Sequence, residues 1–125
     1  VAQAMDRIID VFPPHQQQQI RLQIAQTLKG ALYQCLVPSV QGEGRVAAVE
    51  ILMATTAVKS IIREGKTHQI MNAVETGIEY GMQTIDQALI DRYRRGKISR
   101  DMVLEWCRDP VEVKRQLDGI LLKQR

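Results

Sequence analysis

The chain has 125 residues, a formal net charge of +3 and an isoelectric point near 9.1. Hydrophobic residues make up 45% of it and charged residues 25%, which is typical of a soluble globular domain. No apolar run approaches the roughly 20 residues that span a bilayer, and no signal-peptide pattern opens the chain. We therefore expect a cytoplasmic protein without membrane insertion.

An apolar pattern at the start of the chain predicts a first helix, which the prolines at 13 and 14 must end. The residues expected on its buried face are Met5, Ile8, Ile9 and Phe12. No capping residue precedes this helix, which indicates either a helix cut from a longer one or a processed leader. A second helix is predicted from about residue 15 to 32. Its buried side consists of Ile20, Ile24, Leu28 and Ala31.

Two strands are predicted next, at residues 33–37 and 45–53, and a loop rich in Pro and Gly joins them into a hairpin. The second strand is apolar on both faces, so it needs cover on both sides, as in the sheet of an α/β domain. An isolated hairpin is only marginally stable in water. We therefore expect the rest of the sheet to lie outside this chain, or another copy to supply the pairing.

Glu50 is a lone carboxylate within the apolar second strand. Burial of a carboxylate without a partner is costly, so a cation or a hydrogen-bond donor is expected beside it. The candidates are Arg45 and the basic helix that follows the strand. Glu50 is interpreted either as half of a structural ion pair or as a residue that couples the strand to that helix.

Beyond residue 55 the pattern predicts short helices punctuated by glycine. Gly65, Gly77, Gly81 and Gly96 stand where helix C-caps or tight turns are expected. The spacing of Thr84 and Gln87 predicts a capping box, and Ser99 is expected to open a short helix that ends near Cys107, with Trp106 packed inside. Asp109 is the predicted N-cap of the last helix. The residues expected on the buried side of that helix are Val113, Leu117, Ile120 and Leu121.

The residue types that usually carry chemistry do not form a site in this sequence. Cys35 and Cys107 match no metal-ligand spacing and are expected to be free thiols. Neither histidine has a ligand-spaced partner, and no Gly-rich phosphate loop occurs. The basic run at residues 92–97 is interpreted as a cationic helix C-terminus. We therefore expect no catalytic, nucleotide-binding or metal-binding residue in this chain.

The helix predicted at residues 56–64 has an apolar stripe and a charged face. The stripe consists of Ala57, Val58, Ile61 and Ile62. The residues that face away are Lys59, Ser60, Arg63 and Glu64. Lys59 and Arg63 are four residues apart, so two like charges stand one above the other, and Lys66 extends the basic strip. Taken alone, this pattern is that of a solvated charged face.

The segment from Ala57 to Glu64 reads Ala-Val-Lys-Ser-Ile-Ile-Arg-Glu. It resembles the retraction motif of the PilT-like type IV pilus retraction ATPases, which has the form Ala-Ile-Arg-Asn-Leu-Ile-Arg-Glu. The departures are Lys59, where Arg is usual, and Ser60, where Asn is usual. If the third position of the motif makes a bidentate contact, Lys59 weakens that contact. If the position needs only a positive charge, Lys59 retains it.

Three further segments resemble this family in the same order along the chain, at residues 6–13, 44–52 and 81–89. The resemblance implies the end of a RecA-like α/β ATPase core at residues 1–54, with two helices and the hairpin. It also implies a helical C-terminal subdomain at residues 55–125 that carries the motif. The expected fold is thus mostly α with one β-hairpin, within the secretion ATPase superfamily of type II and type IV systems.

The resemblance further implies a parent protein that forms hexameric rings and uses ATP and Mg to retract pili during twitching motility. Such a protein lies at the cytoplasmic side of the inner membrane and acts on the platform at the pilus base. This chain alone is expected to bind no nucleotide and not to hydrolyse ATP. Four further residues are candidates for coupling or interface roles: Asp6, Arg7, Arg45 and Glu50.

Two alternatives from other functional classes remain open at this point. One is a free-standing helical interaction module without ATPase activity, which regulates or caps a motor ring. The other is a small basic nucleic-acid binder, which predicts binding that weakens steeply with salt. The second is disfavoured because the sequence lacks interleaved aromatic residues, so no nucleic-acid partner is expected.

Overall fold

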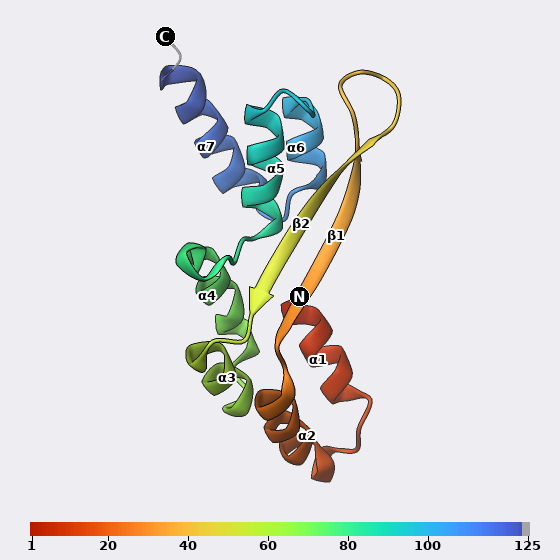
Figure 1. The fold of residues 1–125 in the computed structure, drawn as a ribbon, viewed down its shortest axis with the longest axis vertical. Helices are drawn as coiled ribbons and strands as arrows, with labels where there is room; N and C mark the ends of the chain where they lie inside the picture. Colours follow the sequence, from red (N-terminus) through yellow and green to blue (C-terminus); the bar gives the residue numbers. More distant parts are fainter. Residues whose placement is uncertain (124–125) are drawn as a thin grey trace. The chain divides into compact units, whose positions relative to one another are not determined.

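The computed structural model of this chain describes residues 1–123 and consists mainly of helices, with one β-hairpin, as predicted (Figure 1). In chain order the elements are α1 (Ala2–Asp10), α2 (Pro14–Thr27), β1 (Gly30–Pro38), β2 (Arg45–Met53), α3 (Thr56–Arg63), η1 (Thr67–Gln69), α4 (Ile70–Thr76), η2 (Ile78–Tyr80), α5 (Ile85–Arg94), α6 (Arg100–Trp106) and α7 (Pro110–Lys123). The letter η denotes a short 3-10 helix. None of the helices in residues 1–123 is long and apolar enough to cross a membrane.

The chain folds as two compact units, and each strand contributes to both of them. We call the first the motif unit, which comprises Val1–Tyr33 and Glu50–Gln83. The second, which we call the three-helix unit, comprises Gln34–Val49 and Thr84–Arg125 and is described as far as Lys123. Each unit has a hydrophobic core of its own.

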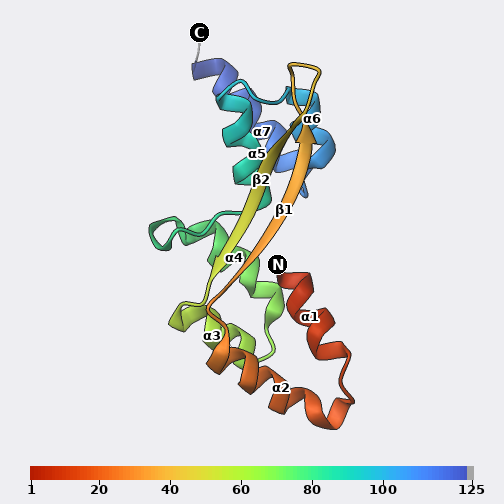
Figure 2. The same ribbon diagram turned by 45° about the vertical axis from the view of Figure 1, so that its right-hand side comes forward.

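The motif unit is built from α1 to α4 and one end of the hairpin. Helix α2 packs against α1 and α3, and α3 packs against α4 (Figure 1, Figure 2). Its core consists of Val1, Met5, Ala25, Leu52, Val58, Ile62, Ile70, Val74 and Met82. These are aliphatic and sulfur-containing side chains, so the scarcity of aromatic residues does not prevent a closed core.

The three-helix unit packs α5, α6 and α7 together with the other end of the hairpin (Figure 2). The fully or nearly buried members of its core include Cys35, Val37, Ala48, Leu89, Val103, Val113 and Leu117. The predicted helix starts are confirmed. Thr84 and Gln87 form the capping box, Ser99 caps α6, and the Asp109 carboxylate accepts the Glu112 amide hydrogen.

Strand β2 has the predicted bounds, but the second helix and the first strand differ from prediction. Helix α2 ends at Thr27 instead of residue 32, and β1 already begins at Gly30. Leu28 adopts an extended backbone, and the Ala54 amide donates to the Lys29 carbonyl, so pairing with the end of β2 replaces the last helical turn. Ala25 is the buried residue of α2, which the predicted buried side did not include.

Several side chains predicted to be buried are exposed instead. Ile8 is 46% exposed, Trp106 37% and Leu121 43%. Each lies at the margin of a helix face whose centre is filled by smaller or better placed residues, such as Ile9 in α1 and Leu117 in α7. Apolar periodicity locates the buried face of a helix, but its width depends on what packs there.

The predicted glycines lie at helix ends or turns, and Gly77 is the C-cap of α4. Gly65, Gly81 and Gly96 have φ angles of 71°, 81° and 71°, which favour glycine. Gly77 has an ordinary φ of −91° and is buried. It is required for space, because a Cβ there would lie 2.5 Å from Met82 Cε and 2.8 Å from the Ala73 carbonyl oxygen.

Candidate functional site: the α3 helix and its supports

Helix α3 carries the segment that resembles the retraction motif, and it is fixed by its cap and by its apolar face. The Thr55 hydroxyl oxygen accepts a hydrogen bond of 3.3 Å from the Val58 amide, which satisfies an otherwise unpaired donor. Val58 and Ile62 are fully buried in the core of the motif unit, and Ile61 is half-buried. The helix is therefore held along one side.

The charged residues at the C-terminal end of the segment face solvent, as predicted. The polar residues in its middle are less exposed. Arg63 and Glu64 are exposed, whereas Lys59 and Ser60 are half-buried. Ala57 was predicted to belong to the apolar stripe, but it is exposed. It lies in the first turn of α3, beside the row formed by the buried Val58 and Ile62 rather than within it.

The C-terminal end of α3 combines charges from several segments. The Glu64 carboxylate and the Lys66 amine form an ion pair of 3.3 Å, with both side chains more than half exposed. Such a pair contributes little to stability. The Arg21 side chain of α2 reaches the turn at Gly65, where a Cβ would lie 3.3 Å from its Nε atom. Cations here are favoured by the helix dipole, and the end of α3 presents a mainly basic surface.

Helix α2 also contacts the last turn of α3 through a glutamine. The Gln18 Nε2 atom donates to the Arg63 carbonyl oxygen at 3.5 Å, which supplies a partner for a carbonyl at the end of the helix. The glutamine run at residues 16–19 lies near the start of α2. Nothing in its spacing indicates a partner 45 positions away.

Glu50 is fully buried, as its place in an apolar strand suggested, and one of its partners is a group that was not among the predicted candidates. Its Oε2 atom lies 2.8 Å from the Val1 nitrogen, at the start of α1. Arg45 was one predicted partner. It lies instead in the three-helix unit, where it donates to the Leu36 carbonyl oxygen at 3.1 Å. Arg45 is at the first residue of β2, five positions from Glu50, so the register of the hairpin directs it to the facing strand.

Asp6 is brought to the segment that follows α3. Its Oδ1 atom accepts a hydrogen bond of 2.6 Å from the Thr67 hydroxyl in η1. The neighbouring Arg7 is exposed in the same unit. The structure thus joins Asp6 and Glu50 to the surroundings of α3, while Arg45 belongs to the other unit. Thr67 has no signal in the sequence because its partner is 61 residues distant.

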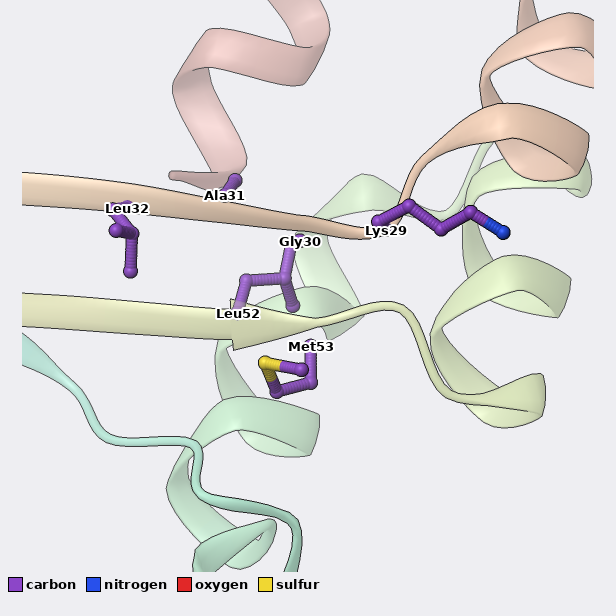
Figure 3. A pocket seen from close by; sticks show the side chains of 6 residues that line it. All are labelled: Lys29, Gly30, Ala31, Leu32, Leu52 and Met53. Atoms are coloured by element: carbon purple, nitrogen blue, oxygen red, sulfur yellow. The ribbon is translucent and has the colours of Figure 1, made fainter.

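A shallow, open hollow of about 550 Å³ lies at the start of the hairpin in the motif unit (Figure 3). Its lining consists of Lys29, Gly30, Ala31, Leu32, Leu52 and Met53. The lining is mainly apolar, and the Lys29 amine points away from the other labelled side chains. Within residues 1–123 no group of three or more His, Cys, Asp or Glu side chains is placed to hold a metal ion.

Both cysteines are free thiols, as predicted. Burial raises the pKa of the Cys35 thiol above its ordinary value. Burial, and after it the negative charge of Asp86, also raises the pKa of the Cys107 thiol. Both thiols are therefore held in the protonated, unreactive form at neutral pH.

With the fold and the surroundings of α3 established, comparison with known proteins defines the class. The crystal structure of the pilus retraction motor PilT with bound ADP matches this chain with a TM-score of 0.80 at 35% identity. The match covers 92% of this chain and 32% of that chain. The fold is therefore that of one part of a pilus motor ATPase. No protein-family model matches the chain.

Sequence relatives are similar to this chain over most of its length. The type IV pilus retraction ATPase PilT of Pseudomonas aeruginosa is 38% identical over 109 residues, which are 87% of this chain and 31% of the relative. A twitching motility protein of Neisseria gonorrhoeae is 42% identical over 98 residues, which are 78% of this chain and 26% of the relative. The chain spans less than a third of the length of these relatives. In sequence and fold it corresponds to the C-terminal portion of a PilT-like pilus retraction ATPase.

Proposed function

We propose that this chain is the C-terminal segment of a hexameric, ATP-driven motor that retracts type IV pili. Its part in the motor is to pass nucleotide-driven movement to a neighbouring subunit or to the platform at the pilus base. The similarity to PilT over most of the chain supports this proposal more directly than it supports a free-standing regulatory module. ATP and Mg would be bound by residues that this chain does not contain.

The observation that carries the proposal is the two-sided character of α3. Val58 and Ile62 fix one face in a core, and Arg63 and Glu64 present charges to solvent at the end of the same short helix. A helix held in this way moves as one piece with the core behind it. Charges at its end then pass that movement to the groups that they contact. The contact is ionic, so it is favoured by a partner with matching charges.

The proposal also assigns the two parts of the chain. Residues 1–54 would complete the RecA-like ATPase core, and residues 55–125 would form the helical C-terminal subdomain with the retraction motif. The parent protein would lie in the cytoplasm, peripheral to the inner membrane, and would bind no nucleic acid. Asp6, Arg7, Arg45 and Glu50 are proposed to serve coupling or subunit contacts.

The test replaces Arg63 by alanine in the complete gene product that contains this segment. We expect ATP turnover within about twofold of the wild type and loss of pilus retraction, because the proposal assigns phosphate binding to residues outside this chain. Arg94→Ala is the matched control, since Arg94 is also an exposed arginine in the last turn of a helix. It should leave both activities unchanged.

Two outcomes would contradict the proposal. If the complete gene product hydrolyses no ATP and instead binds a separate motor ATPase, the regulatory module is the better description. If Arg63→Ala retracts pili like the wild type, α3 does not transmit the movement.

Lys59→Arg, which restores the usual family residue, tests the third position of the motif: faster retraction would indicate a bidentate contact there.

A further inference from the structure

Helix α1 is hydrogen-bonded to segments on both sides of α3 in the chain. At its start, the Val1 nitrogen lies 2.8 Å from Glu50 Oε2 in β2, the strand that leads into α3. Further along, Asp6 Oδ1 accepts a hydrogen bond of 2.6 Å from Thr67 Oγ1 in η1, the turn that follows α3. All of these groups belong to the motif unit. Helix α3 is therefore bracketed by two contacts with one other helix.

The contact at Glu50 is the buried one of the two. Its carboxylate is fully buried, and a hydrogen bond to an ionised carboxylate is roughly twice as strong as one between neutral groups. The first backbone N–H groups of a helix have no partner within it, and its dipole favours a negative charge at this end. The start of α1 is therefore held against β2 by the buried carboxylate of Glu50.

The contact at Asp6 is more exposed and lies at the segment that follows α3. Asp6 is exposed and Thr67 is half-buried, so the hydrogen bond between them competes with water. Helix α1 also packs against η1, which keeps the two side chains in reach of each other. The Lys66 amide donates to the Ile61 carbonyl, so the turn after α3 is tied to the last turn of the helix itself. A shift of α1 at Asp6 therefore reaches α3 through few bonds.

We propose that Glu50, Asp6 and Thr67 are positioning residues through which α1 acts as a clasp on the motif helix α3. This inference rests on the function proposed above and specifies how α3 is set in place for its mechanical step. The core contacts of Val58 and Ile62 fix one face of α3, while the clasp fixes its two ends. Movement of α1 is then transmitted to the exposed charges at Arg63 and Glu64.

The experiment measures hydrogen exchange of the amides at 56–63 in the complete gene product. Thr67→Val keeps the shape of the side chain and removes the hydroxyl donor, and we expect these amides to exchange about fivefold faster. Glu50→Gln keeps the size of the side chain and removes its charge, and we expect the same amides to exchange about tenfold faster. The matched control is Thr76→Val, because the Thr76 hydroxyl donates within its own helix, to the Asn72 carbonyl.

The same variants are assayed for ATP turnover and pilus retraction. We expect turnover within about twofold of the wild type, and retraction several-fold slower. Thr67→Ser keeps the hydroxyl and should restore both exchange and retraction, which a purely steric role of the threonine methyl group would not allow. Should Glu50→Gln fail to fold, the Thr67 variants decide alone, because that site lies outside the core.

The remaining outcomes distinguish failure of the clasp proposal from failure of the proposed motor function. Unchanged exchange at 56–63 in Thr67→Val would overturn the clasp. Faster exchange with undiminished retraction would overturn its mechanical role. If exchange changes as expected in a gene product that neither hydrolyses ATP nor retracts pili, the proposed function fails, while the structural clasp is upheld.

Discussion

The helices of the two units begin in different ways. In the three-helix unit, α5, α6 and α7 each start at a side chain that accepts a backbone hydrogen bond, at Thr84, Ser99 and Asp109. In the motif unit, α1, α2 and α4 start without such a side-chain bond, and α3, with Thr55, is the exception. The three-helix unit is thus specified mainly by local signals, and the motif unit by contacts between distant segments.

The difference bears on function because the one capped helix of the motif unit is the motif helix. A local cap marks the start of α3, and its buried residues Val58 and Ile62 pack into the core of the motif unit. In the three-helix unit the connection between α6 and α7 is held by Asp86, whose carboxylate accepts the amide hydrogens of Arg108 and Asp109 at 2.8 and 3.1 Å. The end of α6 and the start of α7 are thus joined to the first turn of α5 by a side chain.

The largest expected effect comes from the two cores. Ile62→Ala in the motif unit and Leu117→Ala in the three-helix unit each remove a fully buried side chain and should each destabilise by about 2–5 kcal/mol. Urea unfolding followed by two probes, one in each unit, measures this. Each substitution should shift mainly the transition of its own unit. A single shared transition for both would show that the two cores unfold together.

A smaller effect is expected from two glycines that are required for different reasons. Gly77→Ala in the motif unit places a Cβ against Met82 and the Ala73 carbonyl and should cost about 1–3 kcal/mol through overpacking. Gly96→Ala in the three-helix unit meets nothing within 4 Å, and its φ of 71° should cost about 1–2 kcal/mol. Thermal unfolding compares them. Unchanged stability in Gly77→Ala would contradict the tight packing there.

The helix caps test the comparison directly. Thr84→Ala removes the capping box of α5, and Thr55→Ala removes the single cap hydrogen bond of α3; each should cost about 1 kcal/mol. Because Thr84 takes part in a reciprocal pair with Gln87, its loss should be the greater of the two. Serine at either position should restore most of the stability. A larger loss at Thr55 than at Thr84 would contradict this order.

The smallest effect concerns acid stability of the three-helix unit. Hydrogen bonds from Arg115, and then from Gln116, lower the pKa of Glu112 from its ordinary value of 4.5 to about 2. Because the pKa is lower in the folded state, the contribution of this carboxylate is present above pH 4.5 and disappears as the pH falls toward 2. Glu112→Gln should therefore slightly lower the melting temperature at pH 7 but not near pH 2. A constant difference across this range would contradict the assignment.

Much of the three-helix unit follows from the sequence because its signals are short-range. The caps at Thr84, Ser99 and Asp109 were predicted from spacing alone, since each lies within three residues of its partner. The bounds of β2 and the end of α5 near Gly96 followed in the same way. The candidate segment at 57–64 was also found from its residues, because its apolar spacing and its resemblance to the retraction motif are both local.

The surroundings of that segment required the tertiary structure. Spacing does not indicate that Val1 faces Glu50, that Thr67 faces Asp6, or that Gln18 reaches Arg63, since 45 to 61 residues separate the partners. The early end of α2 had the same origin, because pairing of Lys29 with Ala54 decided it. Local sequence thus determined which helices form and where most of them start. Only long-range packing decided how the motif helix is held, because a hydrogen bond between distant segments exists only once the chain has folded around it.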